Sequence, residues 1–547
     1  MAQLQRGVLQ LDARDNVLIA LEDLRAGEVV ASGMAGDGAT LTLPGAVPAK
    51  HKFVTAARAP GDPVFMYGVL VGRATRPIPA GGVVNTANLK HDSAAFTTER
   101  HPQAWSAPDA SRWRERTFLG YHRADGRVGT RNIWLVVPMV FCENRNIAVL
   151  RQAFEEELGY AQPPKYRRQV AQLAAGYREG GARVAEQPAS ARVFEYVDGI
   201  RFLTHTAGCG GTRDDAQGLC GLLAGYITHP NVAGATVLSL GCQHAQIAML
   251  MAEIQKRDPH FARPLLVFDQ QRLGTEATLM DRAITETFAG LVQADQCRRT
   301  PAPLSRLTLG LKCGGSDGFS GISANPAIGH TADMLATLGG IGVLAEFPEL
   351  CGVEQSLIDR CQNQAGAERF AALMRTYAAR AREVGSGFDM NPSPGNIRDG
   401  LITDAMKSAG AARKGGRSPV AAVLDYPELA TAAGLNLLCT PGNDVECVTA
   451  QVAAGCNVVL FTTGLGTPTG NPIAPVVKLA TNTALAARMP DIIDIDTGAI
   501  VTGASTVEAM GERILERVIE IASGTVAVQA ELLGQYDFIP WKRGVSL

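Results

Sequence analysis

Apolar runs of strand length alternate with alanine-rich stretches through most of the chain, and this alternation restricts the fold more than any other feature. Two such pairs are NIWLVVPMVF with NIAVLRQAFEEELGY, and GATVLSLG with CQHAQIAMLMAEIQKRD. The pattern resumes after Pro419 with AAVLDY, GLNLLCT and GCNVVLFTTG. Strands that read as continuous apolar runs between helices are typical of mainly parallel sheets covered on both faces. We therefore predict α/β domains.

The N-terminal segment has a different pattern. Its short apolar runs are separated by Gly, Pro and Asp, as in VLIAL, KFVTAA and VFMYGVLVG. Small strands joined by turns are expected from such punctuation. We predict a β-rich domain over residues 1–95, a polar linker over 96–117, and α/β domains over 118–300 and 301–547. The last boundary rests on the two prolines of TPAPLSR.

Charge and chain length limit the partners. The 547 residues carry 51 Lys and Arg against 53 Asp and Glu, which gives a formal net charge of −2. Nucleic-acid binding and anionic membranes normally demand a basic excess, so we expect neither as a partner. The first residues lack a basic segment followed by an apolar core, and we expect a cytoplasmic protein with a small-molecule ligand. A homo-oligomer is left open.

Several long motifs occur in a distinctive order. They are FLGYHRADGRVGTRN, HTAGCGGTRDDA, HPNVAGATVLSLGCQ, LKCGGSDGFSGISANPAIG, NPSPGN and PGNDVECVTAQVAAGCNVVLFTTGLGTP. Together they resemble the altronate and galactarate dehydratase family of sugar-acid lyases. The resemblance implies a β-clip (SAF) domain over residues 1–95, followed by two α/β domains with mainly parallel sheets. It also implies dependence on iron(II).

The chain departs from the family pattern in two places. The family's SAF domain commonly ends in a histidine-rich turn, whereas residues 83–88 here read VVNTAN. If those histidines bind metal in relatives, that site is missing here. The segment after NPSPGN, which reads IRDGLITDAMKSAGAARKGG, also differs from the family pattern.

Three of the eleven cysteines are candidates for iron ligands. Cys209, Cys242 and Cys313 each stand in a glycine-flanked turn after a predicted strand. Open α/β sheets gather their sites at the carboxyl ends of strands, so the three thiols are expected to converge on iron, as Fe²⁺ or as an iron–sulfur cluster. The alternative is that they fill tight turns as small apolar residues.

Dehydration of a polyhydroxy acid needs a cation at the carboxylate, a base and an acid. For proton transfer we select His205, whose ordinary pKa lies near neutrality, together with Ser316 and Asp317 in the glycine-rich loop. The alternative for His205 is a hydrogen-bonded structural residue. A purely structural turn is the alternative for the loop.

The candidates for substrate binding are arginines and amides. Guanidinium groups bind carboxylates through two parallel hydrogen bonds, which suits a sugar acid. The candidates are Arg123, Arg127, Arg131, Asn325 and Asn443. An ion-paired turn is the alternative for the arginines.

These observations favour a hydro-lyase that converts a hexonate or hexarate, such as altronate or galactarate, to a 2-keto-3-deoxy acid. One rival is a sulfo-lyase acting on a sulfonated hydroxy acid. The other is a non-catalytic sugar-acid binding protein that has kept the scaffold.

Overall fold

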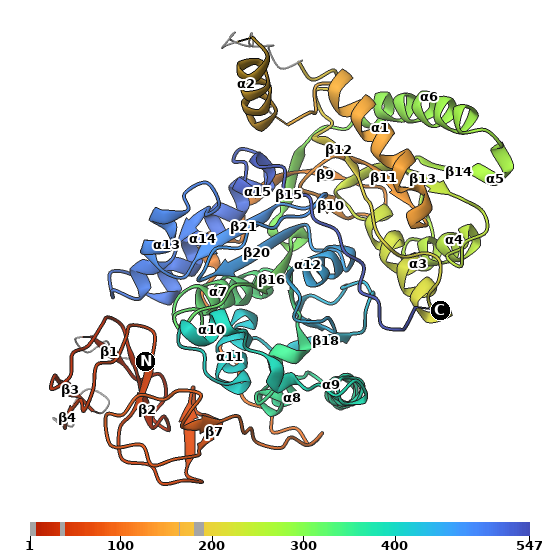
Figure 1. The fold of residues 1–547 in the computed structure, drawn as a ribbon. Coiled ribbons are helices and arrows are strands. Elements are labelled where there is room, and N and C mark those ends of the chain that lie inside the picture. Colours follow the sequence, from red (N-terminus) through yellow and green to blue (C-terminus); the bar gives the residue numbers. More distant parts are fainter. Residues whose placement is uncertain (1–6, 33–38, 163–164, 180–190, 547) are drawn as a thin grey trace.

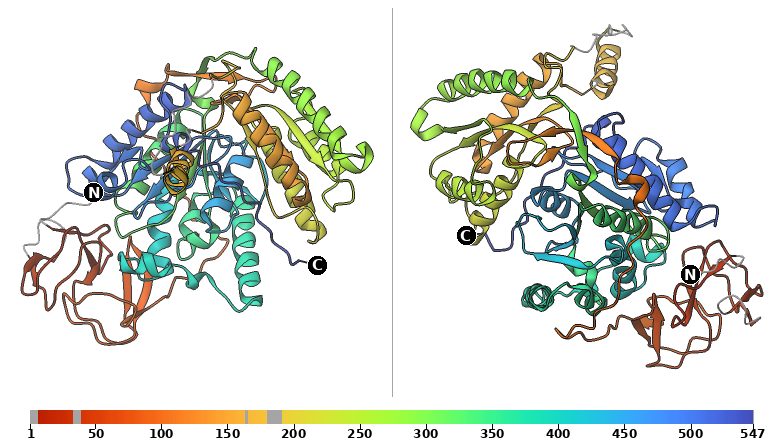
Figure 2. Two further views of the ribbon diagram at one scale, coloured as in Figure 1. Left: turned by 45° about the horizontal axis from the view of Figure 1, so that its top comes forward. Right: turned by 180° about the vertical axis from the view of Figure 1, so that it is seen from behind.

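The computed structural model describes residues 7–32, 39–162, 165–179 and 191–546. The chain forms three domains, and the C-terminal domain lies between the other two (Figures 1 and 2). Among the described residues, no helix has both the length and the apolar character needed to cross a membrane.

The N-terminal domain consists of small antiparallel sheets with the strand orders β1-β2-β5, β3-β4 and β6-β7-β8. The strands are β1 (Val8–Leu9), β2 (Val17–Ala20), β3 (Val29–Ala31), β4 (Thr40–Thr42), β5 (Lys52–Val54), β6 (Pro63–Met66), β7 (Val69–Ala74) and β8 (Leu89–Lys90). One group of its apolar side chains shares a cluster with Phe319, Ile322 and Met406 of the C-terminal domain, whereas another group forms a separate cluster within the N-terminal domain. The N-terminal domain is therefore docked by a hydrophobic contact.

The second domain contains a parallel sheet of order β12-β11-β13-β14. Its strands are β11 (Ile133–Pro138), β12 (Gly199–Phe202), β13 (Val232–Ser239) and β14 (Leu265–Asp269). Its helices are η2 (Phe141–Glu143), α1 (Asn144–Glu157), α2 (Lys165–Glu179), α3 (Arg213–Ile227), α4 (Ile247–Arg257), α5 (Gln270–Leu273) and α6 (Glu276–Ala294).

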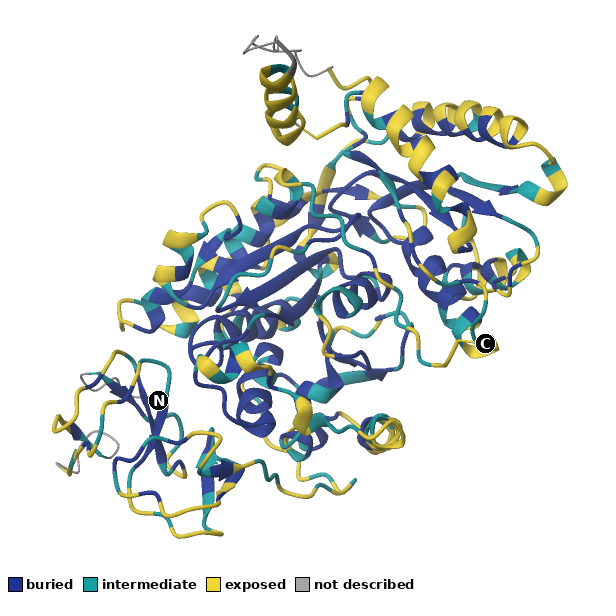
Figure 3. Ribbon diagram, viewed as in Figure 1, coloured by how far each residue is buried: buried dark blue, intermediate teal, exposed yellow. Residues whose placement is uncertain are grey.

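Alternate residues of β11 belong to different cores. Leu135 and Val137 share a cluster with residues of α3 and α4, whereas Trp134 and Val136 share another with residues of α1 and α6. Successive side chains of a strand point to opposite faces, so each face of this sheet has its own helical cover. Figure 3 shows the resulting buried sheet under helices with exposed outer faces.

A small antiparallel sheet of order β10-β9-β15 connects the two α/β domains. It contains β9 (Thr117–His122), β10 (Val128–Gly129) and β15 (Thr300–Pro303), with η1 (Ser111–Trp113) before it and η3 (Leu304–Arg306) after it.

The C-terminal domain has a seven-stranded parallel sheet of order β18-β19-β17-β16-β20-β21-β22. The strands are β16 (Thr308–Cys313), β17 (Ile341–Leu344), β18 (Val420–Leu424), β19 (Gly434–Leu438), β20 (Val458–Thr463), β21 (Val476–Ala480) and β22 (Ile495–Asp496). The helices are α7 (Ala324–Thr337), η4 (Phe347–Leu350), α8 (Glu354–Arg360), α9 (Gln364–Glu383), η5 (Phe388–Met390), α10 (Pro394–Arg398), α11 (Asp404–Ala411), η6 (Ala412–Gly415), α12 (Asp444–Ala453), α13 (Thr483–Arg488), η7 (Gly498–Ile500), α14 (Val507–Ala522) and α15 (Gln529–Leu532).

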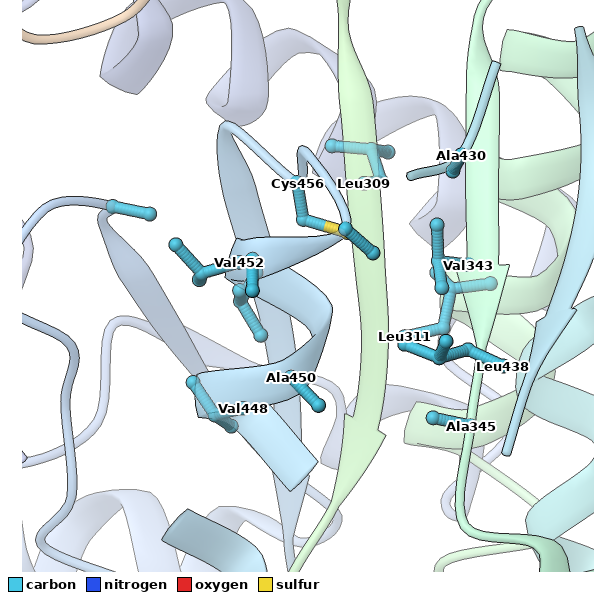
Figure 4. Packing of buried hydrophobic residues seen from close by; sticks show 14 of the residues in the cluster. Leu309, Leu311, Val343, Ala345, Ala430, Leu438, Val448, Ala450, Val452 and Cys456 are labelled. Carbon is cyan, nitrogen blue, oxygen red and sulfur yellow. The ribbon is translucent and has the colours of Figure 1, made fainter. Parts of the chain in front are cut away.

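Helices cover both faces of β16, the central strand. Buried side chains of β16 and α12 belong to the same core, part of which Figure 4 shows. Gly310 lets the Gln451 side chain of α12 approach closely, because a Cβ atom at 310 would lie 3.2 Å from its Oε1 atom. The predicted fold class, a β-rich domain followed by two mainly parallel α/β domains, is confirmed.

The second and C-terminal domains pack through α3 and α12. A Cβ atom on Gly225 of α3 would lie only 2.5 Å from the Ala453 carbonyl oxygen, whereas one on Gly218 would meet nothing closer than Tyr426 at 3.9 Å. The two glycines of α3 thus differ in the room that each leaves for a side chain.

We expect Gly225→Ala to lower stability by about 1–3 kcal/mol through overpacking. Gly218→Ala is the matched control and should raise stability by up to about 1 kcal/mol, because alanine favours the helix. Differential scanning calorimetry of both variants measures the effect. Equal melting temperatures for the two variants would contradict the close α3–α12 contact.

Candidate functional site

A group of buried charged side chains lies where β16 and β17 end. We call it the lysine–glutamate cluster, and it consists of Lys312, Cys313, Glu346, Glu349, Lys407, Lys414 and Asp444. Its lysines and carboxylates balance in number. Sites of open α/β sheets form at this carboxyl edge.

Glu346 joins two of the lysines. The Lys414 ammonium lies 2.7 Å from Glu346 Oε2 and 2.9 Å from Cys313 Sγ. The Lys312 ammonium contacts the other Glu346 oxygen and lies 3.0 Å from Asp444 Oδ1. The Asp444 side chain is 29% exposed, so the cluster reaches solvent there.

Glu349 holds the third lysine. Lys407 Nζ lies 2.7 Å from Glu349 Oε1 and donates to Asn391 Oδ1 at 2.9 Å. The Cys313 thiol donates to Glu349 Oε2 at 3.6 Å, so both Glu349 oxygens have partners.

Glu346 has a left-handed backbone, with φ 68° and ψ 61°. Its N–H donates to the Thr440 hydroxyl at 2.9 Å, which helps to hold this conformation. A non-glycine residue held there costs on the order of 1–3 kcal/mol, and such strain concentrates at functional sites. The strain turns the chain so that the Glu346 carboxylate meets Lys312 and Lys414.

The charges shift the pKa values of the cluster. Burial alone would raise the pKa of Glu349, but the ammonium groups of Lys407, Lys414 and Lys312 lower it to about 2. Burial alone would lower the pKa of Lys414, but Cys313 and the carboxylates raise it above its usual range. Burial raises the pKa of Cys313 in spite of Lys414. The cluster thus holds charged lysines beside a thiol.

The cluster includes a candidate metal-ligand set. Ligand atoms of Cys313, Glu346 and Glu349 all lie within 4.8 Å of one another, and the three residues are buried. One sulfur and two carboxylate oxygens are donors that iron accepts, so the residues fit the expected metal. The Lys414 ammonium contacts two of these residues, Cys313 and Glu346, so it would have to move for a cation to bind between them.

A second centre forms around Asp317 in the loop after β16. Its Oδ1 atom accepts hydrogen bonds from the hydroxyls of Ser320 and Thr481, at 3.1 and 3.0 Å. Its Oδ2 atom lies 3.1 Å from Lys50 Nζ and 3.3 Å from Asn482 Nδ2. Because Lys50 belongs to the N-terminal domain, this buried carboxylate ties the two domains together.

Lys52 lies at the same junction and is fully buried. Its ammonium donates to the carbonyls of Gly400 at 2.7 Å and Lys50 at 2.9 Å. Burial lowers the pKa of Lys52 to about 7.

The structure does not gather the three predicted metal cysteines. Cys209 and Cys242 are exposed in adjacent turns of the second domain, where the Gly208 carbonyl accepts the His244 N–H at 3.0 Å. Cys313 is buried in the lysine–glutamate cluster. Among the described residues, neither Cys209 nor Cys242 belongs to a group of three close ligands.

His205 has backbone partners on both ring nitrogens. Nε2 lies 2.8 Å from the Pro138 carbonyl oxygen, and Nδ1 accepts the Ala207 N–H at 3.1 Å. Burial lowers the pKa of His205, which favours the neutral ring. This environment corresponds to the structural alternative considered for His205.

The three predicted arginines bind groups of the protein itself. Arg131 forms a bidentate pair with Glu531 at 2.7 and 2.8 Å. Arg127 pairs with Asp125 at 2.6 Å, and Arg123 donates to the Pro230 carbonyl at 2.7 Å. All three precede β11, so they lie toward the amino end of the second domain's sheet.

The remaining predicted residues lie around the β16 loop and α12. Ser316 is buried, and its carbonyl accepts a hydrogen bond from Asn396 at 2.7 Å. Asn325 donates to the Gly410 carbonyl and accepts from Thr462 at 2.6 Å. Asn443 caps α12, accepting the Val445 and Glu446 N–H groups.

None of the lysines of the cluster was among the site residues predicted from the sequence. Lys312 had a signal, because it is a charged residue inside the apolar run LTLGLKC. Glu346 and Glu349 had another, since AEFPEL follows the strand IGVL. Lys407 and Lys414 lie in the segment that departs from the family pattern, which gave no cue to their roles.

Family models match the three domains in order. They are described as an altronate/galactarate dehydratase SAF domain over residues 6–92, a D-galactarate dehydratase/altronate hydrolase second domain over 120–295, and a D-galactarate/altronate dehydratase C-terminal domain over 304–546. The resemblance predicted from the motifs is confirmed.

The relatives with named activities include two dehydratases and a sulfo-lyase subunit. An altronate dehydratase of Escherichia coli (strain K12) is 33% identical over 94% of this chain and 95% of its own length. A galactarate dehydratase (L-threo-forming) of the same organism is 30% identical over 93% and 91%. A (2R)-sulfolactate sulfo-lyase subunit beta of Chromohalobacter salexigens is 29% identical over 78% of this chain and 97% of its own length.

The low pKa of Lys52 predicts a pH dependence. Its pKa falls from 10.5 to about 7 on folding, so the unfolded chain binds more protons between these values and stability should rise with pH there. Lys52→Met should reduce this rise, to which Lys478 also contributes because burial lowers its pKa to about 8. Exposed Lys90→Met is the control. The test is to measure the melting temperatures of the parent and both variants from pH 6.5 to 10.5. If melting temperature changes with pH in the same way for the parent and Lys52→Met, the prediction is contradicted.

Proposed function

Because the chain belongs to the D-galactarate/altronate dehydratase family, we propose that it removes water from a sugar acid. The substrate is a hexonate or hexarate with a hydrogen on C2 and a hydroxyl on C3. Loss of both gives an enol that becomes the 2-keto-3-deoxy acid. The observation that carries the proposal is the buried lysine–glutamate cluster in the domain that matches the dehydratase C-terminal model.

The cluster can meet the three chemical needs of the reaction. Ammonium groups stabilise the substrate carboxylate and the enolate that follows removal of the C2 proton. Lys414, kept protonated by its neighbours, is the candidate acid for the departing hydroxyl. The Glu349 oxygen beside Lys407 is the candidate base, and it accepts a proton readily only once Lys407 turns from it to the substrate. The other Glu349 oxygen, beside Cys313, is the one offered to iron.

Cys313, Glu346 and Glu349 are the proposed ligands of iron. When bound, iron(II) would supply a Lewis acid at the substrate carboxylate or hydroxyl. The lysines would then hold the substrate and exclude water from the buried edge.

A sulfo-lyase remains the second candidate, since one relative carries that name. The two reactions release different products. We would incubate the anaerobically purified protein, supplied with iron(II), with a panel of hexonates and hexarates and with sulfolactate. Formation of a 2-keto-3-deoxy acid without sulfite supports dehydration. Sulfite release from sulfolactate alone favours the rival, and turnover of no substrate contradicts both.

Cys313→Ser should greatly lower both bound iron and dehydration, because a hydroxyl is a poor substitute for a thiolate on iron. Cys220→Ser is the control, since Cys220 is a buried residue of α3 in the second domain. Iron content and 2-keto acid formation are measured without oxygen. Circular dichroism first establishes that each variant is folded. Full iron and full turnover in Cys313→Ser would remove Cys313 from the ligand set.

A further inference from the structure

A second group of potential metal ligands lies outside the lysine–glutamate cluster. His91 follows β8 of the N-terminal domain, Cys351 follows η4, and Asp404 begins α11 of the C-terminal domain. One ligand atom from each lies within 4.8 Å of the other two. The group therefore combines three elements and two domains, and it shares no residue with the ligand set proposed for iron.

Asp404 has an unused acceptor. The residue is 1% exposed, and its Oδ2 atom has no hydrogen-bond partner. Its Oδ1 atom accepts a long hydrogen bond from the Ser408 hydroxyl at 3.4 Å, and the Cys351 thiol lies beside the carboxyl group. Buried polar atoms without partners are rare and costly, so this oxygen points to a missing ligand.

A cavity of about 470 Å³ opens beside the group. His91 and Cys351 line it, together with the acids Glu354 and Asp389. A cation can enter from this side, and the space admits water as a further ligand. The cavity thus supplies the open coordination position that three protein ligands leave.

An ordinary structural role accounts for only part of the arrangement. An acid in the first turn of α11 is favoured by the helix dipole, and Cys351 can fill a tight turn. Neither role explains the unused Asp404 oxygen. His91 approaches α11 partly because its Nδ1 atom accepts the Ala405 N–H at 3.4 Å.

We propose that His91, Cys351 and Asp404 bind a divalent transition metal of the zinc type, which fastens the N-terminal domain to the C-terminal domain. Imidazole, thiolate and carboxylate are all zinc ligands, whereas magnesium and calcium prefer oxygen alone. The site is a structural clip, distinct from the iron set.

Cobalt(II) is the probe, because a cysteine ligand gives a thiolate-to-cobalt absorption band. The full chain carries Cys313→Ser to remove the other candidate thiolate, and it is stripped of metal with a chelator. We expect one equivalent of Co²⁺ with this band, displaced by Zn²⁺. Zn²⁺ should also raise the melting temperature.

In the same background, Cys351→Ser should lose the band and the zinc-induced rise in melting temperature. His91→Gln and Asp404→Asn keep the approximate side-chain shape and should weaken Co²⁺ binding by roughly tenfold or more, since even outer-shell changes cost about that much. Cys361→Ser is the matched control, because this buried thiol donates only to the Leu357 carbonyl.

Absence of the band in the Cys313→Ser protein, or its survival in a folded Cys351→Ser variant, would overturn the clip. Because Cys313 is absent throughout, neither outcome depends on whether the protein binds iron or dehydrates a sugar acid. Circular dichroism of each variant separates loss of a ligand from loss of the fold.

Discussion

The Lys312 ammonium has no exposed surface, and the carboxylates of Glu346 and Asp444 keep it charged inside the C-terminal domain. Burying a charge without a partner is so costly that the carboxyl edge of the sheet must bring these acids to it. The requirement explains the left-handed backbone of Glu346, which delivers its carboxylate to the strand end. Breaking a buried pair of this kind costs about 3–5 kcal/mol, so the edge is specified by charge as well as by packing.

The same edge also organises the neighbouring domain. Asp317 accepts hydrogen bonds from two strand-end loops and binds Lys50 of the N-terminal domain. Phe319 and Ile322, which follow Asp317 closely, contribute to the core shared with that domain. This loop thus contacts the N-terminal domain through both a polar and an apolar group. Binding of the N-terminal domain therefore accounts for part of the glycine-rich motif around Cys313.

The sequence predicted what depends on local pattern. Apolar runs such as VVLFTT identified buried parallel strands, and the ordered motifs identified the family. Contacts between residues far apart in the sequence could not be predicted from local pattern. Arg131 resembled a carboxylate-binding residue because nothing near it reveals Glu531, 400 residues later.

The cysteines illustrate the same limit. Glycine-flanked turns were correctly expected at strand ends for Cys313, but the sequence does not tell which strand ends of two separate sheets meet. The lysines of the cluster were missed because a buried lysine becomes favourable only through acids supplied by other loops.

The covalent connection between the N-terminal domain and the rest of the chain has a consequence for how tightly the N-terminal and C-terminal domains must bind each other. A short tether makes docking an intramolecular event with an effective concentration in the millimolar range. The Lys50 ion pairs and the small shared core therefore need only a modest intrinsic affinity to remain closed. If the chain were cut within residues 96–117, association of the two pieces would depend on their concentration, and they would separate on dilution.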